Sequence, residues 1–280
     1  MNATLFRQKK IFPRHVTEKL SNLRLDYKEK NAQIDQSRRE GSKHLKAAVV
    51  LLLNFKKTNG HAEYVFQLIK RSRKVAQGGD ISCPGGMLQP RQDFLLSALL
   101  AKGLLPLIGG KLIGKTWRED GDTPALIRLF LTTALREAWE EIGLNPLNTK
   151  FLGALPSYSL TMFARTIFPL VCLTRRPFTY RLSSEVEKIL EIPVSFFFNP
   201  ENYAMLDIKT SLGPDMEPFQ YQTPCLVVPN TDGDEDILWG ATFNIIHHFL
   251  RVVSDDTLPE FNAARTKNKI LTLTYLSPKG

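Results

Sequence analysis

The segment LREAWEEIGL at residues 135–144 has the apolar spacing of an amphipathic helix and crowds three carboxylates onto it. At about 100° per residue, positions three and four apart are surface neighbours, so the carboxylates share one arc: Glu137, Glu140 and Glu141. The roughly opposite arc is apolar and consists of Leu131, Leu135, Trp139 and Ile142. Gly143 predicts the end of the helix, because glycine readily adopts the left-handed conformation that terminates helices. The chain must therefore bury one face of this helix and keep an acidic face beside it.

This acidic arc is unfavourable as a purely structural feature. Each carboxylate near the C-terminus of a helix faces the negative end of the helix dipole, which costs about 0.3–1 kcal/mol. The carboxylates also repel one another. A bound divalent cation such as Mg²⁺ would reverse the sign of both effects, since it prefers oxygen ligands. The alternative is a solvated acidic face. The residues upstream of the helix decide between the two.

Length and composition restrict the class of protein. With 280 residues, 43% hydrophobic and 23% charged, the chain can form one large globular domain or one domain with appendages. The longest apolar run, AAVVLLL at 47–53, is far below the ~20 residues that a membrane-spanning helix needs. Three cysteines without a C-x-x-C pair suggest neither a disulfide framework nor a zinc site, and they fit a reducing, cytoplasmic compartment.

The formal net charge of +9 favours an anionic partner. The candidates are a phosphorylated metabolite, a nucleic acid and an anionic membrane surface. Nucleic acid is disfavoured, because no stretch interleaves basic and aromatic residues as a groove for single strands does. Charge alone does not separate the other two candidates, and the expectation of a nucleotide-type small molecule and no membrane rests on the family resemblance given below.

The first residues, MNATLFRQKKIFPRH, are basic and are followed by the first acidic residue only at Glu18. Such a segment is compatible with a mitochondrial transit peptide, but it is poor in serine, and we interpret it as a solvated basic arm. The sequence then divides into a basic arm, short helix and linker over 1–42, a globular domain over 43–255, and a C-terminal tail over 256–280.

The globular part alternates strands and helices. Two apolar stretches, 45–55 and 62–72, are joined by a segment with Asn59-Gly60, which predicts a β-hairpin. The other expected elements are strands at 151–159 and 164–174, a capped helical turn at 183–193, an extended stretch at 194–198 and a helix at 237–253. Because this order lacks βαβ regularity, it predicts a mixed α/β sandwich with helices on a curved sheet.

Four stretches of the sequence resemble one known family. PGG at 84–86 and REAWEEIGL at 136–144 resemble the two ends of the Nudix box, G-x5-E-x7-R-E-U-x-E-E-x-G-U, where U is a bulky aliphatic residue. RSRKVAQGGDISCPGG, which begins with Arg71 and Ser72, is similar to the segment before the box in the coenzyme A pyrophosphatase branch. SSEVEKILEIPVSFFF and LWGATFNII are similar to later stretches of that branch. The resemblance covers roughly residues 45–252 and implies a Nudix-type α/β/α sandwich (α+β) with a curved mixed sheet.

The resemblance also implies a hydrolase that cleaves phosphoric anhydrides with Mg²⁺ or Mn²⁺. Its expected substrate is coenzyme A or acyl-coenzyme A, split into adenosine 3′,5′-bisphosphate and 4′-phosphopantetheine. The implied metal site comprises Glu137, Glu140, Glu141 and the Gly85 carbonyl, and Arg136 completes the catalytic set by orienting the glutamates. The implied substrate-binding residues are Arg71, Ser72 and Gly86. Glu185 would be a further ligand or general base, or else a plain carboxylate at the start of a helix.

The box also departs from the family pattern. Arg136 follows Gly86 by 50 residues, so an insertion at about 94–128 separates the two halves. The first glutamate of the box is absent, and Gln92 or Asp93 stands near its place. The substrate therefore stays open between coenzyme A and other nucleoside diphosphate derivatives, namely ADP-ribose, a dinucleotide or an RNA 5′ end. A non-catalytic Nudix-fold binding module is the third possibility.

The remaining candidates concern packing. The insertion contains the apolar run FLLSALLAKGLLPLI, so we expect a partly helical excursion that packs near the pocket mouth or at a homodimer contact. Cys83, beside the glycine loop, is either a reactive thiol or, as we prefer, a small apolar filler. The adjacent His247 and His248 cannot face one site from a helix, and we interpret them as packing or surface residues.

Overall fold

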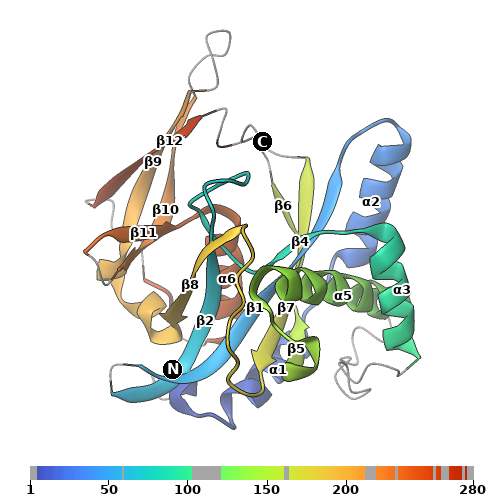
Figure 1. The fold of residues 1–280 in the computed structure, drawn as a ribbon, viewed down its shortest axis with the longest axis horizontal. Coiled ribbons are helices and arrows are strands. Elements are labelled where there is room, and N and C mark those ends of the chain that lie inside the picture. The colour runs from blue at the N-terminus through green and yellow to red at the C-terminus, as the bar shows by residue number, and fades with distance from the viewer. Residues whose placement is uncertain are drawn as a thin grey trace.

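A long antiparallel hairpin runs through the centre of the molecule (Figure 1). It consists of β1 (Leu45–Thr58) and β2 (His61–Arg71), whose pairing begins at Leu52 and Gln67. The hairpin predicted from the sequence is thus confirmed. The computed structural model describes residues 5–58, 60–102, 121–160, 164–211, 219–230, 233–254, 257–259, 265–272 and 275.

The hairpin belongs to an eight-stranded mixed sheet. Its other strands are β3 (Ile81–Ser82), β4 (Gly85–Met87), β5 (Thr149–Ala154), β6 (Tyr158–Leu160), β7 (Arg165–Thr174) and β8 (Val186–Pro193). The order along the main path is β3-β2-β1-β7-β5, while β4 pairs with β1, β6 with β7 and β8 with β2. β1 and β7 run parallel, and the other pairs are antiparallel.

The strand β1 changes its partner along its length. Its first part pairs with β4 from Ala47 to Val49, and its second part pairs with β2 from Leu52 onward. Between them, the backbone N–H of Val50 donates to the Pro84 carbonyl at 2.8 Å. Because β7 pairs with the opposite edge of β1, β2 and β4 share one edge and must diverge there. This divergence is where the candidate site lies.

A second, four-stranded sheet lies to one side of the first (Figure 1). Its strands in spatial order are β11 (Glu235–Leu238), β10 (Gln220–Pro229), β9 (Tyr203–Ser211) and β12 (Thr266–Thr272). The strand β12 runs parallel to β9 and comes from the stretch interpreted as a C-terminal tail. None of these four strands was among those expected from the sequence.

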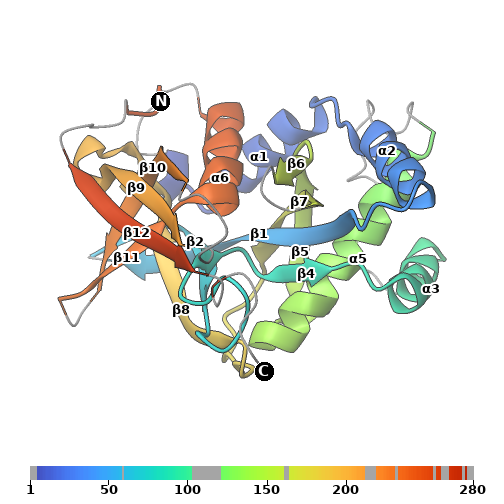
Figure 2. The ribbon, with the colours of Figure 1, turned by 90° about the horizontal axis from the view of Figure 1, so that it is seen from above.

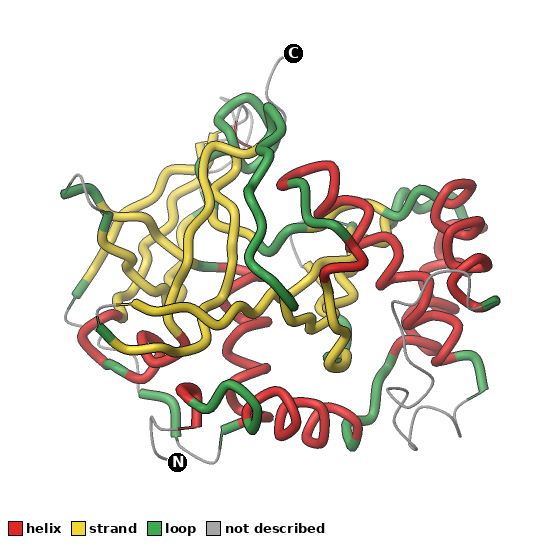
Figure 3. The backbone as a smooth tube through the Cα atoms, turned by 60° about the horizontal axis from the view of Figure 1, so that its bottom comes forward, coloured by secondary structure: helices red, strands yellow, loops and turns green. Residues whose placement is uncertain are grey.

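Helices cover both faces of the main sheet (Figure 2). On one face lie α1 (Phe12–Ser21) and α6 (Gly240–Val253), and on the other lie α2 (Tyr27–Arg39) and α5 (Thr123–Ile142). Figure 3 shows these helical segments in red beside the yellow strands. The predicted α/β/α sandwich with a curved mixed sheet is confirmed. None of the helices that the structure describes is long and apolar enough to cross a membrane.

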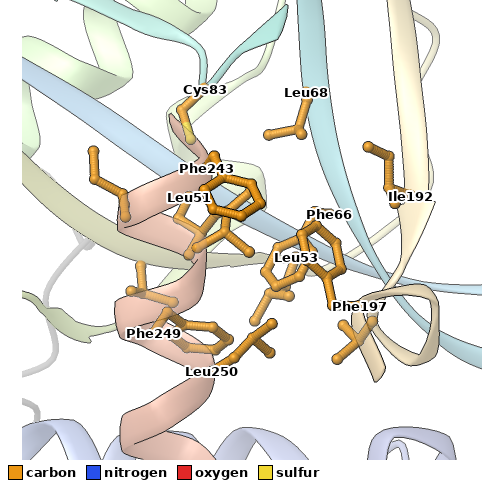
Figure 4. Close-up of a cluster of buried hydrophobic side chains, with 14 of the residues drawn as sticks. Leu51, Leu53, Phe66, Leu68, Cys83, Ile192, Phe197, Phe243, Phe249 and Leu250 are labelled. Carbon is orange, nitrogen blue, oxygen red and sulfur yellow. The ribbon is translucent and has the colours of Figure 1, made fainter. Parts of the chain in front are cut away.

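The core has two compartments, because successive residues of β1 point to opposite faces of the sheet. Leu51 and Leu53 join the cluster around α6, which Figure 4 shows with Phe243. Val50 and Leu52 join the cluster around α5. The apolar run in this part of the sequence therefore reflects a strand that is buried on both faces.

The helix α5 carries the acidic arc and ends where the sequence predicts. Gly143 follows it with a φ of 72°, which is the left-handed conformation. Trp139 was expected on the buried face, but it is 44% exposed and lies under the Arg181 guanidinium at 5.1 Å. The buried face is instead formed by residues such as Leu131, Leu135 and Ile142.

The insertion begins as the helix α3 (Pro90–Ala101), as expected of a partly helical excursion. Phe94 and Leu95 on this helix are exposed. Residues 103–120 of the insertion lie outside the described residues. The packing of the insertion at the pocket mouth or at a homodimer contact stays a prediction.

Two local predictions were wrong. The segment SSEVEKILEIP leads into the strand β8 rather than a helical turn, and the next residues form the 3-10 helix η3 (Val194–Phe198) rather than an extended stretch. Antiparallel pairing of β8 with β2 outweighs the local capping signal of the two serines. The other 3-10 helices are η1 (Leu5–Arg7), η2 (Pro146–Asn148) and η4 (Pro200–Asn202).

The basic N-terminal segment contributes to the core. Four of its apolar residues are at most 1% exposed and pack in the cluster around α6: Phe6, Phe12, Val16 and Leu20. The described part of this segment is therefore packed, and it is not the solvated arm expected from its charge. The reason is that residues 12, 16 and 20 recur at helical spacing, so α1 presents an apolar face to the sheet while its cations stay outside.

We expect Phe12→Ala to lower the free energy of unfolding by about 3–5 kcal/mol, because it removes a fully buried ring. Arg14→Ala, an exposed change on the same helix, should alter it by less than about 0.5 kcal/mol. Urea denaturation of both variants measures the difference. Equal stability of the two variants would mean that the segment is a separate arm after all.

Candidate active site

A cavity of about 570 Å³ lies where β2 and β4 diverge. The helix α5 supplies Glu137 and Glu141 to its wall, and β4 supplies Gly85 and Gly86. Residues of α6, β10 and β12 line the cavity as well. The cavity therefore joins the acidic arc of α5, the glycine loop and the second sheet in one site.

Arg136 is the hub of the acidic side of this site. Its side chain is buried, and its Nε donates to Asp93 Oδ1 at 2.8 Å. Nη2 donates to Glu137 Oε1 at 2.9 Å and to the Met87 carbonyl at 3.2 Å, and Nη1 donates to Glu140 Oε2 at 3.1 Å. Burial alone would lower the pKa of Arg136, but its hydrogen bond to Asp93 and the charges of Glu137 and Asp93 raise it. Arg136 is thus a permanent cation that fixes α5 to α3 and β4.

Asp93 completes the hub from α3. Its side chain is fully buried, and it accepts hydrogen bonds from the Gln89 backbone N–H at 2.8 Å and the Thr133 hydroxyl at 3.0 Å as well as from Arg136. These partners compensate a charge that would otherwise be costly to bury. Gln92 is exposed beside it. Of the two residues near the place of the missing acidic residue of the box, Asp93 and not Gln92 therefore contacts Arg136.

Glu141 is a carboxylate that is 5% exposed at the cavity wall. Its Oε2 accepts a hydrogen bond from the Gly85 backbone N–H at 2.9 Å, which ties the end of α5 to β4. Burial raises the pKa of Glu141 to about 8, and the charges of Glu137 and Glu185 act in the same direction, against Gly85 and Arg71. An ionised Glu141 therefore lacks compensating charge at neutral pH.

Glu137 lies directly against Gly86. A Cβ atom added to Gly86 would stand 2.5 Å from the carboxyl carbon of Glu137, so glycine leaves the room that this carboxylate occupies. Gly85 is constrained differently, because its φ is 147° and an added Cβ would stand 2.3 Å from the Ala48 carbonyl oxygen. Burial raises the pKa of Glu137, although Arg136 opposes the shift. The first glycine thus allows β4 to approach β1, and the second admits the carboxylate.

Glu140 does not line the cavity. Its side chain is 48% exposed and pairs with Arg136. Relative to Glu137, Glu140 lies about 60° to one side around the helix and Glu141 about 40° to the other. The structure therefore brings two of the three predicted glutamates to the cavity and leaves Glu140 outside it.

The described residues contain no group of three carboxylate, thiol or imidazole side chains arranged to hold a metal ion alone. Glu137 and Glu141 nevertheless offer the oxygen donors that Mg²⁺ and Mn²⁺ take, and burial, which raises both pKa values, makes their ionised forms costly unless a cation is close. Mg²⁺ commonly binds through one or two carboxylates together with water and substrate phosphates. The pair therefore fits a cation whose coordination a phosphorylated substrate completes.

The cavity also contains cations and aromatic rings. Arg71 and Arg165 both line it. Four aromatic side chains line it as well: Tyr158, Tyr221, Trp239 and Tyr275. Guanidinium groups match phosphate geometry, and aromatic faces stack with nucleobases. The cavity therefore offers the contacts that a nucleotide needs.

Asp80 joins residues beyond β12 to the cavity. It accepts hydrogen bonds from Lys269 Nζ at 2.6 Å, from Trp239 Nε1 at 3.2 Å and from the Tyr275 hydroxyl. The backbone N–H of Gln77 donates to the Tyr275 carbonyl at 2.7 Å, and Gln77 itself adopts a positive φ of 58°. The C-terminal part of the chain therefore completes one wall of the site.

Comparison with known proteins gives a relative of known activity. No protein-family model matches the chain. The peroxisomal coenzyme A diphosphatase ndx-8 of Caenorhabditis elegans is 43% identical over 162 residues, which are 56% of this chain and 53% of that protein. The chain thus spans about half the length of this curated relative.

Solved structures with a similar fold are Nudix proteins. A NUDIX hydrolase from Alicyclobacillus acidocaldarius is 17% identical, covers 55% of this chain and 80% of its own, and has a TM-score of 0.37. A MutT/nudix family protein from Enterococcus faecalis is 12% identical, covers 81% of this chain and 72% of its own, and has a TM-score of 0.38. Both TM-scores are low, so the family resemblance depends on the box and the curated relative.

The chain resembles the Nudix coenzyme A diphosphatases. This is the resemblance that the box halves at 84–86 and 136–144 predicted, and the relative confirms it. The ion pair between Asp93 and Arg136 fastens α3, at the start of the insertion, to α5, which carries the second half of the box.

Among the predicted substrate-binding residues of the Nudix site, Arg71 and Gly86 line the cavity and Ser72 does not. The backbone N–H of Ser72 donates to the Glu185 carbonyl at 2.8 Å, and its hydroxyl accepts from the Lys74 N–H at 3.3 Å. Glu185 lines the cavity, but it precedes a strand rather than starting a helix. The structure thus places Glu185 at the cavity together with Glu137, Glu141 and Asp80.

Three residues of the site were not singled out from the sequence: Arg165, Asp80 and Tyr275. The sequence could have indicated Arg165, because it is a single cation at the start of the apolar strand ARTIFPLVCLT and such a cation needs a partner when it is buried. Asp80 and Tyr275 meet only through the placement of β12, which no local pattern indicates.

Two other candidates are packing residues. Cys83 is 3% exposed in the core, where Figure 4 shows it, and burial raises the pKa of its thiol to about 12. His247 is buried with Nε2 at 3.1 Å from the Tyr203 hydroxyl, and burial lowers its pKa to about 4. The neighbouring His248 is exposed. These placements agree with the interpretation of all three as packing or surface residues.

The pKa of Glu141 predicts how stability depends on pH in the metal-free protein. The folded pKa of about 8 lies above the ordinary value of 4.5, so the folded state holds the proton more tightly than the unfolded state between these values. Stability should therefore fall as pH rises through this window, by up to about 1.4 kcal/mol per pH unit. Glu141→Gln should remove this slope, and thermal melts in chelator from pH 5 to 8.5 measure it.

Glu140→Gln is the matched control for this experiment, because Glu140 is on the same helix turn but lies outside the cavity. The stability of this variant should depend on pH in the same way as that of the unaltered protein. If Glu141→Gln retains the same slope, Glu141 is not the uncompensated carboxylate.

Proposed function

We propose that this chain is a Nudix-type hydrolase that cleaves the diphosphate of coenzyme A or an acyl-coenzyme A. The products would be adenosine 3′,5′-bisphosphate and 4′-phosphopantetheine or its acyl derivative. One observation carries the proposal: a single cavity holds two carboxylates of the box, the buried Glu141 and the half-buried Glu137, together with two arginines. The identity of 43% to a coenzyme A diphosphatase, over about half of each chain, supports this substrate class.

A divalent cation, Mg²⁺ or Mn²⁺, would be held by Glu137 and Glu141, with Glu185 as a further carboxylate of the cavity. When bound, the cation supplies neutralising charge for the diphosphate and lowers the pKa of a coordinated water. The Gly85 carbonyl stays a candidate ligand. Glu140, which the resemblance also implied, has no place in this set because it lies outside the cavity.

The reaction requires a water oxygen to attack one phosphorus. A P–O bond forms, the bridging P–O bond breaks, and the bridging oxygen leaves with the second phosphate. Glu185 can accept the proton that the water loses, because it is an exposed carboxylate at the cavity and no ion pair engages it within the described chain. Arg71 binds phosphate oxygens, and Gly86 leaves room for Glu137 beside them.

Arg136 acts in this scheme as a positioning residue. It holds Glu137 at 2.9 Å and the β4 carbonyl of Met87 at 3.2 Å, so the carboxylate and the glycine loop keep a fixed relation. A preorganised arrangement of this kind reduces the reorganisation that the reaction would otherwise need.

We also propose a reducing compartment for the protein. All three cysteines are free and buried. The peroxisomal location belongs to the name of the relative, and the comparisons give no support to the mitochondrial alternative. A homodimer stays a prediction.

The test is a substrate panel with Mg²⁺, Mn²⁺ or chelator, read by mass spectrometry of the phosphorylated products. The panel contains coenzyme A, acetyl-coenzyme A, ADP-ribose, NADH and capped RNA. We expect cation-dependent release of adenosine 3′,5′-bisphosphate from the first two. Turnover of ADP-ribose, NADH or capped RNA without coenzyme A cleavage would favour another Nudix activity, and binding without turnover would favour the non-catalytic module.

Variants of the acidic arc sharpen this test. Glu137→Gln and Glu141→Gln should each lower kcat by orders of magnitude, because each removes a charged oxygen from the cavity. Glu140→Gln should cause a much smaller loss, since Glu140 acts only through Arg136. Equal losses in all three variants would contradict the division of the arc into two cavity carboxylates and one outer carboxylate.

A further inference from the structure

Arg165 stands at the start of β7 with an unusual environment. It lines the cavity, and its Nε is buried without a hydrogen-bond partner. Within the described part of the chain, no carboxylate forms an ion pair with it. A desolvated cation without a counter-charge is destabilising. A bound anion from outside the protein would therefore stabilise Arg165.

Arg71, at the end of β2, is a second cavity cation that a bound anion would stabilise. Its Nε donates to the Ala76 carbonyl at 3.0 Å, and no ion pair to a described carboxylate engages its guanidinium. Burial lowers the pKa of Arg165, and the charge of Arg71 lowers it further. Both arginines line the same cavity, so their positive charges repel each other across it.

Two other cations near the site are already paired with carboxylates. Lys70 pairs with Glu187 at 3.1 Å and with Asp236 at 2.9 Å. Lys269 pairs with Asp80 at 2.6 Å. The contrast singles out Arg71 and Arg165 as the cavity cations with charge available for a ligand.

We propose that Arg165 and Arg71 together form a subsite for one phosphate group of the substrate, with Arg165 as a specificity-determining residue. The identity of the substrate rests on the proposed function. The existence of the phosphate-binding subsite does not. A guanidinium group presents two parallel N–H donors to phosphate oxygens, and a phosphate between the pair would remove their repulsion.

Two phosphates of a coenzyme A-type substrate have the required chemistry: the diphosphate and the 3′-phosphate monoester. Arg71 is near the acidic wall, because its charge acts on the pKa of Glu141. Arg165 lies beside Ser159 and Leu160 of β6, which also line the cavity. The experiment therefore has separate arms for the two phosphates.

The experiment compares Arg165→Gln and Arg165→Lys with Arg73→Gln. Arg73 is exposed and does not line the cavity, so its variant removes the same charge near Arg71 without touching the subsite. Calorimetry measures the binding of adenosine 3′,5′-bisphosphate, AMP and inorganic pyrophosphate, none of which needs to be hydrolysed. Steady-state kinetics measure kcat/KM for coenzyme A and dephospho-coenzyme A.

We expect Arg165→Gln to weaken the binding of a phosphate probe by about tenfold to a hundredfold, and Arg165→Lys to restore it only in part. A loss confined to adenosine 3′,5′-bisphosphate and coenzyme A assigns the 3′-phosphate. A loss shared by pyrophosphate and dephospho-coenzyme A assigns the diphosphate. The melting temperature without ligand should hold or rise, because the variant removes an unpaired cation.

Wild-type affinity for all probes in Arg165→Gln overturns the proposal, and so does an equal loss in Arg73→Gln. A fall in the melting temperature of Arg165→Gln with unchanged binding would show that Arg165 is structural. If the protein fails to cleave coenzyme A but Arg165→Gln still loses phosphate binding, the proposed function fails and the subsite stands.

Discussion

The buried ion pair between Arg136 and Asp93 is the contact on which the geometry of the site depends. It fastens α5 to α3, and the hydrogen bond of Arg136 to the Met87 carbonyl extends the same connection to β4. Loss of Arg136 would leave the Asp93 carboxylate buried without a cation, which costs about 3–5 kcal/mol. Because Glu137 and Glu141 lie on the same helix as Arg136, this pair also sets where the carboxylates stand relative to the glycine loop.

The charges of the cavity explain why such a fixed arrangement is needed. Burial opposes the ionisation of Glu141 and Glu137, while Arg71 and Arg165 carry positive charge without a carboxylate partner among the described residues. Direct pairing of the acids with the bases would neutralise the site, but the packed strands and α5 hold them in separate places. A diphosphate bound with a divalent cation would complement both sets of charges at once.

The parts of this site that could be predicted from the sequence are local. The helix α5, its end at Gly143 and the hairpin at 45–72 follow from periodicity and turn chemistry over a few residues. The strand β8 and the burial of α1 could not be read in this way, because pairing and packing with distant segments override the local pattern. Likewise, the direction of Glu140 depends on Arg136, and the role of Arg165 depends on the residues around the cavity rather than on any motif.

The central claim is that Glu137 and Glu141, but not Glu140, form the protein side of a cation site. Anomalous diffraction from crystals soaked in Mn²⁺, with and without adenosine 3′,5′-bisphosphate, tests it most directly. The account predicts a Mn²⁺ peak inside the cavity, bonded to oxygens of Glu137 and Glu141. A peak on the outer face of α5 at Glu140, or no peak in the cavity with the nucleotide bound, would contradict it.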